Sequence, residues 1–229
     1  PILEVKLTEA MTEPLPEEEG FLSPASLPPL LEALKGKTAL AIGPGMGTKE
    51  GVKEMLSRLL RDISLPTVID ADGINLLASA KGVLQEIKAP SVLTPHPGEM
   101  ARLIGVETAQ IQAKRIETAR EVAERYNCVV VLKGSRTVIA SPSGEVFINP
   151  TGNPGMASGG TGDVLTGMIG ALLAQGMEPL EAAKLAVYLH GLSGDLAAEE
   201  VGEVALVATD LLRCLPKAIK ELQGWRPPS

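Results

Sequence analysis

The stretch TALAIGPGMGTKEGVKEMLSRLL, residues 38–60, contains the pattern that decides the fold. A short apolar run ends in a glycine-rich loop, and an amphipathic helical pattern follows the loop. Further apolar runs recur at 66–73 (PTVIDADG), 91–94 (SVLT) and 128–134 (CVVVLKG). Runs that are apolar throughout are typical of parallel strands covered by helices on both faces. The sequence therefore predicts an α/β protein with a mostly parallel sheet.

The rest of the chain fits a three-layer αβα sandwich. Residues 137–149, TVIASPSGEVFIN, predict an antiparallel hairpin at one edge of the sheet. In the segment 108–126 the apolar residues fall on roughly one helical face; they are Ile111, Ile116, Ala119, Val122 and Ala123. Helices are expected at about 48–62, 73–80, 98–105, 108–126, 162–176, 179–199 and 208–222.

Two regions of unequal size are expected along the chain. Residues 1–36 are acidic and rich in proline, and they predict a peripheral arm with one short helix near Leu30. Residues 37–225 predict a single domain, since one hydrophobic core is the default at this length. No internal repeat separates this region into parts.

Composition excludes several classes of function. The 229 residues include 21 basic and 28 acidic side chains, so the net charge is −7, whereas nucleic-acid binding requires a basic surface. No stretch of about 18 uncharged apolar residues predicts a membrane span. Cys128 and Cys214 lie in no zinc-ligand spacing, and we expect them to be reduced thiols in a cytoplasmic protein.

The strongest local signal is NPGMASGGTGDVLTG, residues 153–167. Its glycines lead directly into an apolar helical pattern, so backbone N–H groups at the start of a helix would be free to bind a phosphate. Asp163 would lie in the first turn of that helix, where the helix dipole favours an ionised carboxylate that could act as a general base. The alternative is that Asp163 only caps the helix.

Three further loops follow predicted strands. IGPGMG (42–47) is not a GxGxxG motif, which argues against a Rossmann NAD site. This loop either forms one wall of the substrate site or is a tight turn without a ligand. In DADGIN (70–75), Asp70 and Asp72 could hold water or Mg²⁺, or Asp72 could be a helix cap. In TPHPGE (94–99), His96 and Glu99 are spaced to contact one ligand; the alternative is a solvated loop histidine.

Basic residues follow the last apolar run. In KGSRT (133–137), Lys133 and Arg136 could bind phosphate or ribose, and Gly134 allows close approach of the backbone. The alternative is an exposed hairpin entry. His190 lies among apolar helical residues, and we favour a core or interface role for it over catalysis. The loops from 42 to 163 lie at strand carboxyl ends or helix amino ends, so we expect them to form one cleft.

Five motifs occur along the chain in the order IGPGMG, DADGIN, TPHPGE, KGSRT and NPGMASGGTGDVLTG. Together they resemble the ADP/ATP-dependent NAD(P)H-hydrate dehydratases of the ribokinase-like superfamily. The resemblance covers about residues 38–222 and implies a ribokinase-like fold. It also implies dehydration of the (6S) hydrate of NADH or NADPH, driven by cleavage of ADP or ATP, with Mg²⁺ as cofactor. Members usually begin with a further strand and glycine-containing loop, which we expect this chain to lack before Thr38.

The resemblance also implies roles for individual residues. Asp163 would be the catalytic base. The hydrated dinucleotide would contact Asp163, His96, Asn153, and Gly45 or Gly47 of IGPGMG. The nucleotide would contact Lys133, Gly134, Ser135, Arg136, Thr137, Gly159, Gly160, Thr161 and Gly162. A metal ion would be held by Asp70, Asp72 and Glu99, directly or through water.

Other functions and partners remain open on the sequence alone. One alternative is a ribokinase-like kinase of a small hydroxylated vitamin precursor, and another is a non-catalytic nucleotide-binding subunit. Some members of the family carry an epimerase domain in front, so an epimerase domain or fragment is a candidate partner. We also expect a homo-oligomer, with a tetramer as the first guess, and no nucleic-acid or membrane partner.

Overall fold

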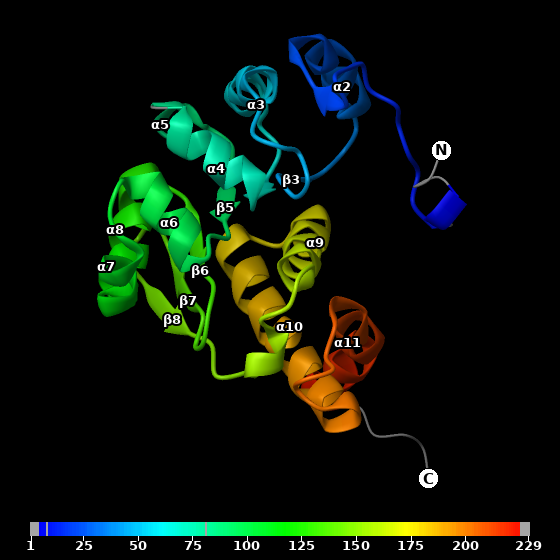
Figure 1. The fold of residues 1–229 in the computed structure, drawn as a ribbon, viewed down its shortest axis with the longest axis vertical. Helices are drawn as coiled ribbons and strands as arrows, with labels where there is room; N and C mark the ends of the chain where they lie inside the picture. The colour runs from blue at the N-terminus through cyan, green and yellow to red at the C-terminus, as the bar shows by residue number, and fades with distance from the viewer. Residues whose placement is uncertain (1–4, 8, 81, 225–229) are drawn as a thin grey trace.

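The computed structural model describes residues 5–7, 9–80 and 82–224, and its centre is a six-stranded sheet (Figure 1). The strand order is β3-β4-β5-β6-β7-β8. The first four strands are parallel, and β7 and β8 form an antiparallel hairpin at one edge, as predicted. The strands are β3 (Leu40–Ile42), β4 (Thr67–Ile69), β5 (Ser91–Leu93), β6 (Val129–Leu132), β7 (Val138–Ala140) and β8 (Val146–Ile148).

Alternate residues of each strand face opposite sides of the sheet and belong to two different cores. Ile69 and Leu93 pack in a core with α3 (Glu50–Asp62), α4 (Asp72–Ser79) and α6 (Pro97–Ile104). Val68 and Val92 pack on the other face with α9 (Thr161–Ala174) and α10 (Pro179–Val201). The three-layer αβα sandwich is therefore confirmed.

The remaining helices extend these two layers. On the first face lie α5 (Val83–Glu86), α7 (Thr108–Ala113) and α8 (Arg115–Tyr126). On the second, α11 (Ala208–Leu222) packs against α10 and α9. Figure 1 shows α10 and α11 side by side at the end of the molecule that carries the C-terminus. No helix in the described part of the chain is both long and apolar enough to cross a membrane.

The predicted single helix over 108–126 is wrong. The helix is interrupted at Lys114, where φ is −138° and ψ is 46°, so two helices form in place of one. The break changes the helical phase, so Ile111 is 1% exposed but Ile116 is 37% exposed. Neither Gly nor Pro marks the break. Arg115, the first residue of α8, instead donates hydrogen bonds to the carbonyls of Leu132 and Lys133, so a tertiary contact overrides the local pattern.

The segment before Thr38 is more ordered than its composition suggests. The expected short helix is present as α2 (Leu27–Ala33), preceded by a 3₁₀ turn, Pro24–Ser26, and a small hairpin of β1 (Glu17–Glu18) and β2 (Phe21–Leu22). Leu27 is buried in the same core as α3. Residues 21–34 therefore pack on the domain that follows, although the prolines conceal any periodicity in the sequence.

Both cysteines are buried free thiols, as predicted. Burial raises the pKa of the Cys128 thiol to about 12, so almost no reactive thiolate exists near neutral pH. We expect negligible labelling of either cysteine by a thiol reagent in the folded protein, and labelling of both after unfolding. Rapid labelling of Cys128 in the native state would contradict this burial. A loss of both thiols in the unfolded, unreduced protein would reveal a disulfide.

Candidate active site

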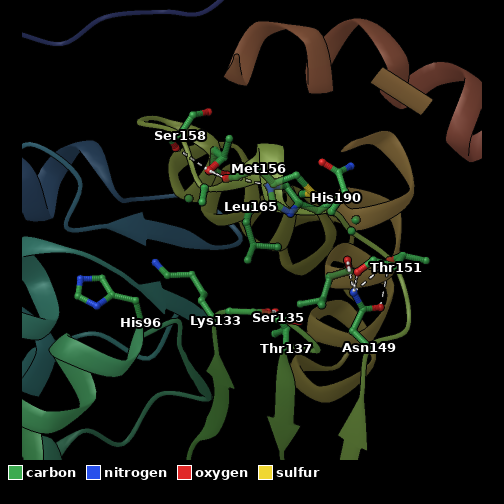
Figure 2. A pocket seen from close by; sticks show the side chains of 18 of the residues that line it. His96, Lys133, Ser135, Thr137, Asn149, Thr151, Met156, Ser158, Leu165 and His190 are labelled. Carbon is green, nitrogen blue, oxygen red and sulfur yellow. Dashed lines mark hydrogen bonds between the residues drawn. The ribbon is translucent and has the colours of Figure 1, made fainter. Parts of the chain in front are cut away.

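A cavity of about 700 Å³ lies at the carboxyl edge of the sheet, between the ends of β4 and β6 and the start of α9 (Figure 2). Of the predicted site residues, those that line it are Asp70, His96, Lys133, Gly134, Ser135, Arg136, Thr137, Asn153, Gly160, Thr161, Gly162 and Asp163. The predicted convergence on one cleft is therefore confirmed for segments from Asp70 to Asp163, but not for the loop 42–47, which does not line this cavity.

The amino end of α9 opens into this cavity. Its N-cap is Gly160, with φ at 87°, and no side chain caps the helix. The first backbone N–H groups of α9 are therefore free to bind an anion. Asp163 lies in the first turn, is exposed, and has no hydrogen bond or ion pair among the described residues. The capping alternative for Asp163 is thus wrong, and its carboxylate is available to a ligand.

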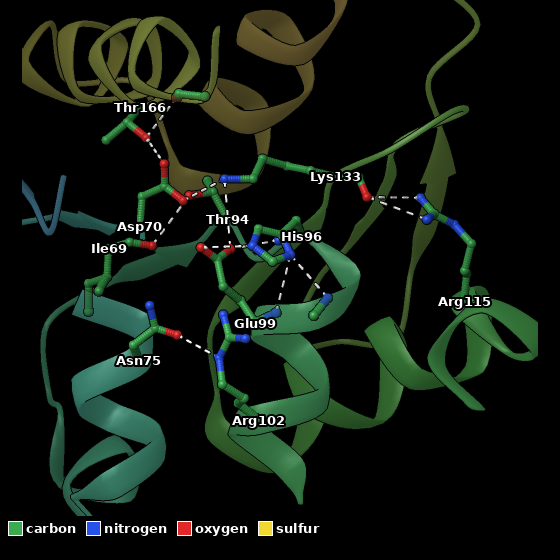
Figure 3. Close-up of polar contacts among 12 residues, drawn as sticks. Ile69, Asp70, Asn75, Thr94, His96, Glu99, Arg102, Arg115, Lys133 and Thr166 are labelled. Carbon is green, nitrogen blue, oxygen red and sulfur yellow. Dashed lines mark hydrogen bonds and ion pairs between the residues drawn. The ribbon is translucent and has the colours of Figure 1, made fainter. Parts of the chain in front are cut away.

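A buried ion pair closes the floor of the cavity (Figure 3). The Nζ of Lys133 lies 2.6 Å from Oδ1 of Asp70, whose other oxygen accepts a hydrogen bond from Thr166 Oγ1 at 2.7 Å. A Cβ placed on Gly162 would come 3.4 Å from the same Nζ. The Lys133 ammonium therefore lies beside the first turn of α9. Its charge adds to that of the helix terminus in attracting an anion.

His96 and Glu99 hold each other at the start of α6. His96 Nδ1 accepts from the backbone N–H groups of Gly98 and Glu99, and Glu99 Oε2 accepts from the N–H of His96 at 2.8 Å. Because Nδ1 is an acceptor, the ring proton of the neutral imidazole is on Nε2. Burial lowers the pKa of His96, although the nearby Glu99 carboxylate opposes that shift. His96 thus lies at the cavity wall with its Nδ1 occupied by two backbone N–H groups.

The KGSRT turn is held by neighbours that the sequence did not indicate. The N–H of Lys133 donates to Pro95 O at 2.8 Å, and the Arg115 guanidinium binds the carbonyls of Leu132 and Lys133. Gly134 has φ at 134°, and a Cβ there would come 2.8 Å from Arg115, so glycine is required. Arg136 stays exposed at the cavity mouth, with its side chain available to a ligand.

Some predicted site residues do not line the main cavity; they are Gly45, Gly47, Gly159, Asp72 and Glu99. Gly45 borders a separate hollow of about 380 Å³ beside Phe21. The N–H of Gly47 donates to Asp72 Oδ2 at 2.8 Å, so Asp72 braces the glycine loop instead of capping α4, whose N-cap is Ala71. Substrate contacts of Gly45 and Gly47 remain predictions.

The three carboxylates predicted to hold a metal ion do not form a cage. Asp70 is paired with Lys133, Asp72 binds the N–H of Gly47, and Glu99 is buried beneath His96. Within the described ranges, no group of three or more His, Cys, Asp or Glu side chains could hold a metal. The residues present therefore do not fit a metal ion bound by protein ligands alone.

The far end of the cavity contains residues that sequence reasoning missed. Asn149 and Thr151 follow β8, and their position after a strand was the available signal. His190 also lines the cavity, and its Nε2 lies 2.8 Å from the carbonyl of Thr161, so it is a cavity residue rather than a core residue alone. Asn153 uses both ends of its amide, one on Asp195 and one on the N–H of Gly155.

Known proteins are similar to this chain in both sequence and fold. The family model described as NAD(P)H-hydrate dehydratase matches residues 2–217. A bifunctional NAD(P)H-hydrate repair enzyme of Moorella thermoacetica is 50% identical over 97% of this chain, and this chain spans only 42% of its length.

Two solved structures are similar to the chain in fold. The ADP/ATP-dependent NAD(P)H-hydrate dehydratase of Bacillus subtilis, co-crystallised with ATP and Mg²⁺, matches with a TM-score of 0.73 and 41% identity over 80% of this chain and 66% of its own. A ribokinase-like superfamily protein of Enterococcus faecalis matches with a TM-score of 0.74 and 32% identity, over 84% of this chain and 66% of its own. The predicted ribokinase-like fold is confirmed.

The Asp70–Lys133 pair generates a stability prediction. Asp70→Ala should lower the free energy of unfolding by about 2–4 kcal/mol, because the largely buried Lys133 ammonium loses its closest partner. The double variant Asp70→Ala/Lys133→Met should lose less than the single variant, because the ammonium is removed together with Asp70, and Glu99, 3.9 Å from Lys133 Nζ, keeps its hydrogen bond from the N–H of His96. Urea unfolding measures both, and Asp62→Ala, on the surface of α3, is the control. Additive losses in the double variant would show that the pair does not act as a unit.

Proposed function

Because the chain belongs to the NAD(P)H-hydrate dehydratase family, we propose that it dehydrates the (6S) hydrate of NADH or NADPH to NAD(P)H. Cleavage of ADP to AMP, or of ATP to ADP, drives the reaction and releases phosphate. One observation carries this proposal. The carboxylate of Asp163, which has no partner within the described ranges, lies in the first turn of a helix whose free N–H groups and neighbouring Lys133 ammonium suit a terminal phosphoryl group.

The geometry suits activation of a hydroxyl group by phosphorylation. Hydroxide is a poor leaving group, so the C6 oxygen of the hydrate first attacks the terminal phosphorus of the nucleotide while Asp163 takes its proton. The bond between that phosphorus and the bridging oxygen of the nucleotide breaks, which releases AMP from ADP. The C6–O bond then breaks and phosphate departs with its electron pair, while the neighbouring carbon C5 gives a proton to solvent and the C5–C6 double bond of the dihydronicotinamide ring forms.

The start of α9 supplies the electrostatic part of catalysis. With the terminal phosphoryl group at the start of α9, backbone N–H groups at Thr161 and Gly162 would face the charge that develops on its oxygens, and the helix orients them before reaction. Lys133 adds a fixed positive charge at the same place. This local attraction is needed because the net charge of −7 disfavours anionic substrates over the molecule as a whole.

The nucleotide is proposed to lie along the KGSRT turn, with its terminal phosphate at α9. Ser135, Arg136 and Thr137 line that part of the cavity. Mg²⁺ is proposed to enter with the nucleotide phosphates, as is usual for this ion, because the carboxylates nearby are already engaged. We assign no step of the mechanism to it.

The alternatives differ from this proposal in their products and partners. A vitamin-precursor kinase would use the same anion site, but the family match favours the dehydratase. An epimerase partner is proposed because the Moorella relative is bifunctional and longer than this chain. The homo-oligomer, with a tetramer as the first guess, and the cytoplasmic location stay predictions.

Replacement of Asp163 by Asn tests the base. The variant keeps the shape of the side chain but removes the proton acceptor, so the rate should fall by about 10²–10⁴, towards the upper part of that range. The melting temperature should change little, because the exposed Asp163 has no hydrogen bond or ion pair to lose among the described residues and gives up only its interaction with the helix dipole. Affinity for ADP should stay equal or rise, because a negative charge is removed.

Recovery of NADH absorbance from the (6S) hydrate with ADP and Mg²⁺ measures the rate. A folded variant that keeps more than about a tenth of the rate would exclude Asp163 as the base.

Replacement of Arg136 by Ala tests the nucleotide position. Arg136 is exposed, so its loss should not affect folding. Affinity for ADP should fall by about 1–3 kcal/mol, the range for a lost charge-assisted hydrogen bond. Calorimetry measures the affinity, and Arg120→Ala, at an exposed site on α8, is the matched control. Equal ADP affinity in the Arg136 variant and the control would remove Arg136 from the nucleotide site.

A further inference from the structure

One face of α10 contacts residues 151–161, which are the loop that precedes α9 together with Thr161, the first residue of that helix; this segment is called the loop 151–161 below. Val187, His190, Gly191, Gly194 and Asp195 recur on this helix at spacings of three and four residues, so they share one side of it. Three of them, Val187, His190 and Gly191, also line the main cavity. The same helix face therefore contacts both the loop and the space that a ligand would fill.

Asp195 holds the first part of the loop. Its Oδ2 accepts from the backbone N–H of Gly152 at 2.8 Å, and its Oδ1 accepts from Nδ2 of Asn153 at 3.0 Å. The other end of the Asn153 amide accepts from the N–H of Gly155 at 3.0 Å. One carboxylate on α10 thereby fixes Gly152 and Asn153 directly and Gly155 through Asn153.

His190 holds the last part of the loop. Its Nε2 lies 2.8 Å from the carbonyl oxygen of Thr161, the first residue of α9. A carbonyl oxygen only accepts, so Nε2 carries the proton and donates. This bond ties the start of α9, where the free N–H groups lie, to the side of α10.

At Thr151 and Met156 the loop also lies directly against the helix. A Cβ on Gly191 would come 2.2 Å from Thr151 Oγ1, and one on Gly194 would come 2.3 Å from Met156 Sδ. The hydroxyl of Thr151 donates to the carbonyl of Tyr188 at 2.9 Å. Glycine on α10 is thus what allows the loop to approach so closely.

We propose that His190 and Asp195 are positioning residues that hold the loop 151–161 in the shape in which the first N–H groups of α9 face a terminal phosphoryl group. The loop needs such support, because it contains Gly152, Gly155, Gly159 and Gly160, whose backbones lose much entropy on ordering. This inference rests on the proposed function only in taking a nucleotide as the ligand. Neither residue has to contact the reacting atoms.

The test compares three variants with a matched control. Both oxygens of Asp195 accept hydrogen bonds, one from the N–H of Gly152 and one from Nδ2 of Asn153. Asp195→Asn keeps the size of the side chain, but its amide NH₂ group then faces one of these two donors, so one hydrogen bond is lost. His190→Leu removes the donor to Thr161, whereas His190→Gln keeps a donor of similar reach. Glu199→Gln is the control, because it removes an exposed carboxylate from the same helix one turn beyond Asp195.

Two readouts separate positioning from general stability. Amide hydrogen exchange over residues 151–163 reports the order of the loop in the ligand-free protein, and a thermal melt reports the whole fold. Calorimetry with ADP and with AMP reports binding with and without the terminal phosphoryl group. A merely structural role would change affinity for both nucleotides equally.

We expect faster exchange in 151–163 for Asp195→Asn and His190→Leu. We also expect about a ten- to hundred-fold loss of ADP affinity, with AMP affinity changed by less than about three-fold. His190→Gln should restore most of the ADP affinity, and Glu199→Gln should match the parent.

Unchanged loop exchange, or equal losses of ADP and AMP affinity, would overturn the inference. If the parent protein bound no ADP, the proposed function would fail. Loop exchange would still decide whether His190 and Asp195 order this segment.

Discussion

The ion pair between Asp70 and Lys133 is the interaction on which the arrangement of the site depends. Asp70 follows β4 and Lys133 follows β6, so their contact at 2.6 Å spans the end of β5. Through Thr166 the same carboxylate also fixes α9, whose first turn lies beside the Lys133 ammonium. One network therefore joins the edge of the sheet, the Lys133 ammonium and the start of α9. It places two sources of positive potential, the ammonium and the helix terminus, where a phosphate would bind. Asp163, whose carboxylate has no partner in the part of the chain that the structure describes, completes the site at its open side.

The parts of the fold that sequence predicted are those in which local composition carries the information. Strands β4, β5 and β6 are buried at every position, which requires the continuous apolar runs seen in the sequence. Because parallel strands end at the same edge, the loops after them were expected to meet, and those after β4, β5 and β6 bring Asp70, His96 and Lys133 to one cavity. The loop after β3 lies at the same edge but borders a separate hollow. The glycine-rich segment before α9 was also informative. The N-cap of this helix, Gly160, has φ at 87°, a conformation that favours glycine, and glycine leaves the helix terminus without a side-chain cap.

The parts that sequence missed depend on contacts between distant residues. The break at Lys114 is set by Arg115 reaching across to the end of β6, and no local pattern records it. Convergence on one edge also did not indicate that Asp70, one of the three carboxylates predicted to hold a metal ion, would pair with Lys133. Likewise, Asn153 and His190 acquire their roles from partners 42 and 29 residues away in the chain. Polar networks of this kind require the fold before they can be seen.

The central claim is that phosphoryl transfer at α9 serves to remove water, not to make a stable phosphate ester. Phosphorus NMR of the unmodified protein with ADP, Mg²⁺ and the (6S) hydrate of NADH, recorded together with absorbance at the NADH maximum, tests this most directly. The account predicts AMP, inorganic phosphate and NADH in equal amounts. A stable phosphoester that accumulates while absorbance stays flat would identify a kinase. ADP that is bound but never cleaved would identify a nucleotide-binding module, and either result would contradict the account.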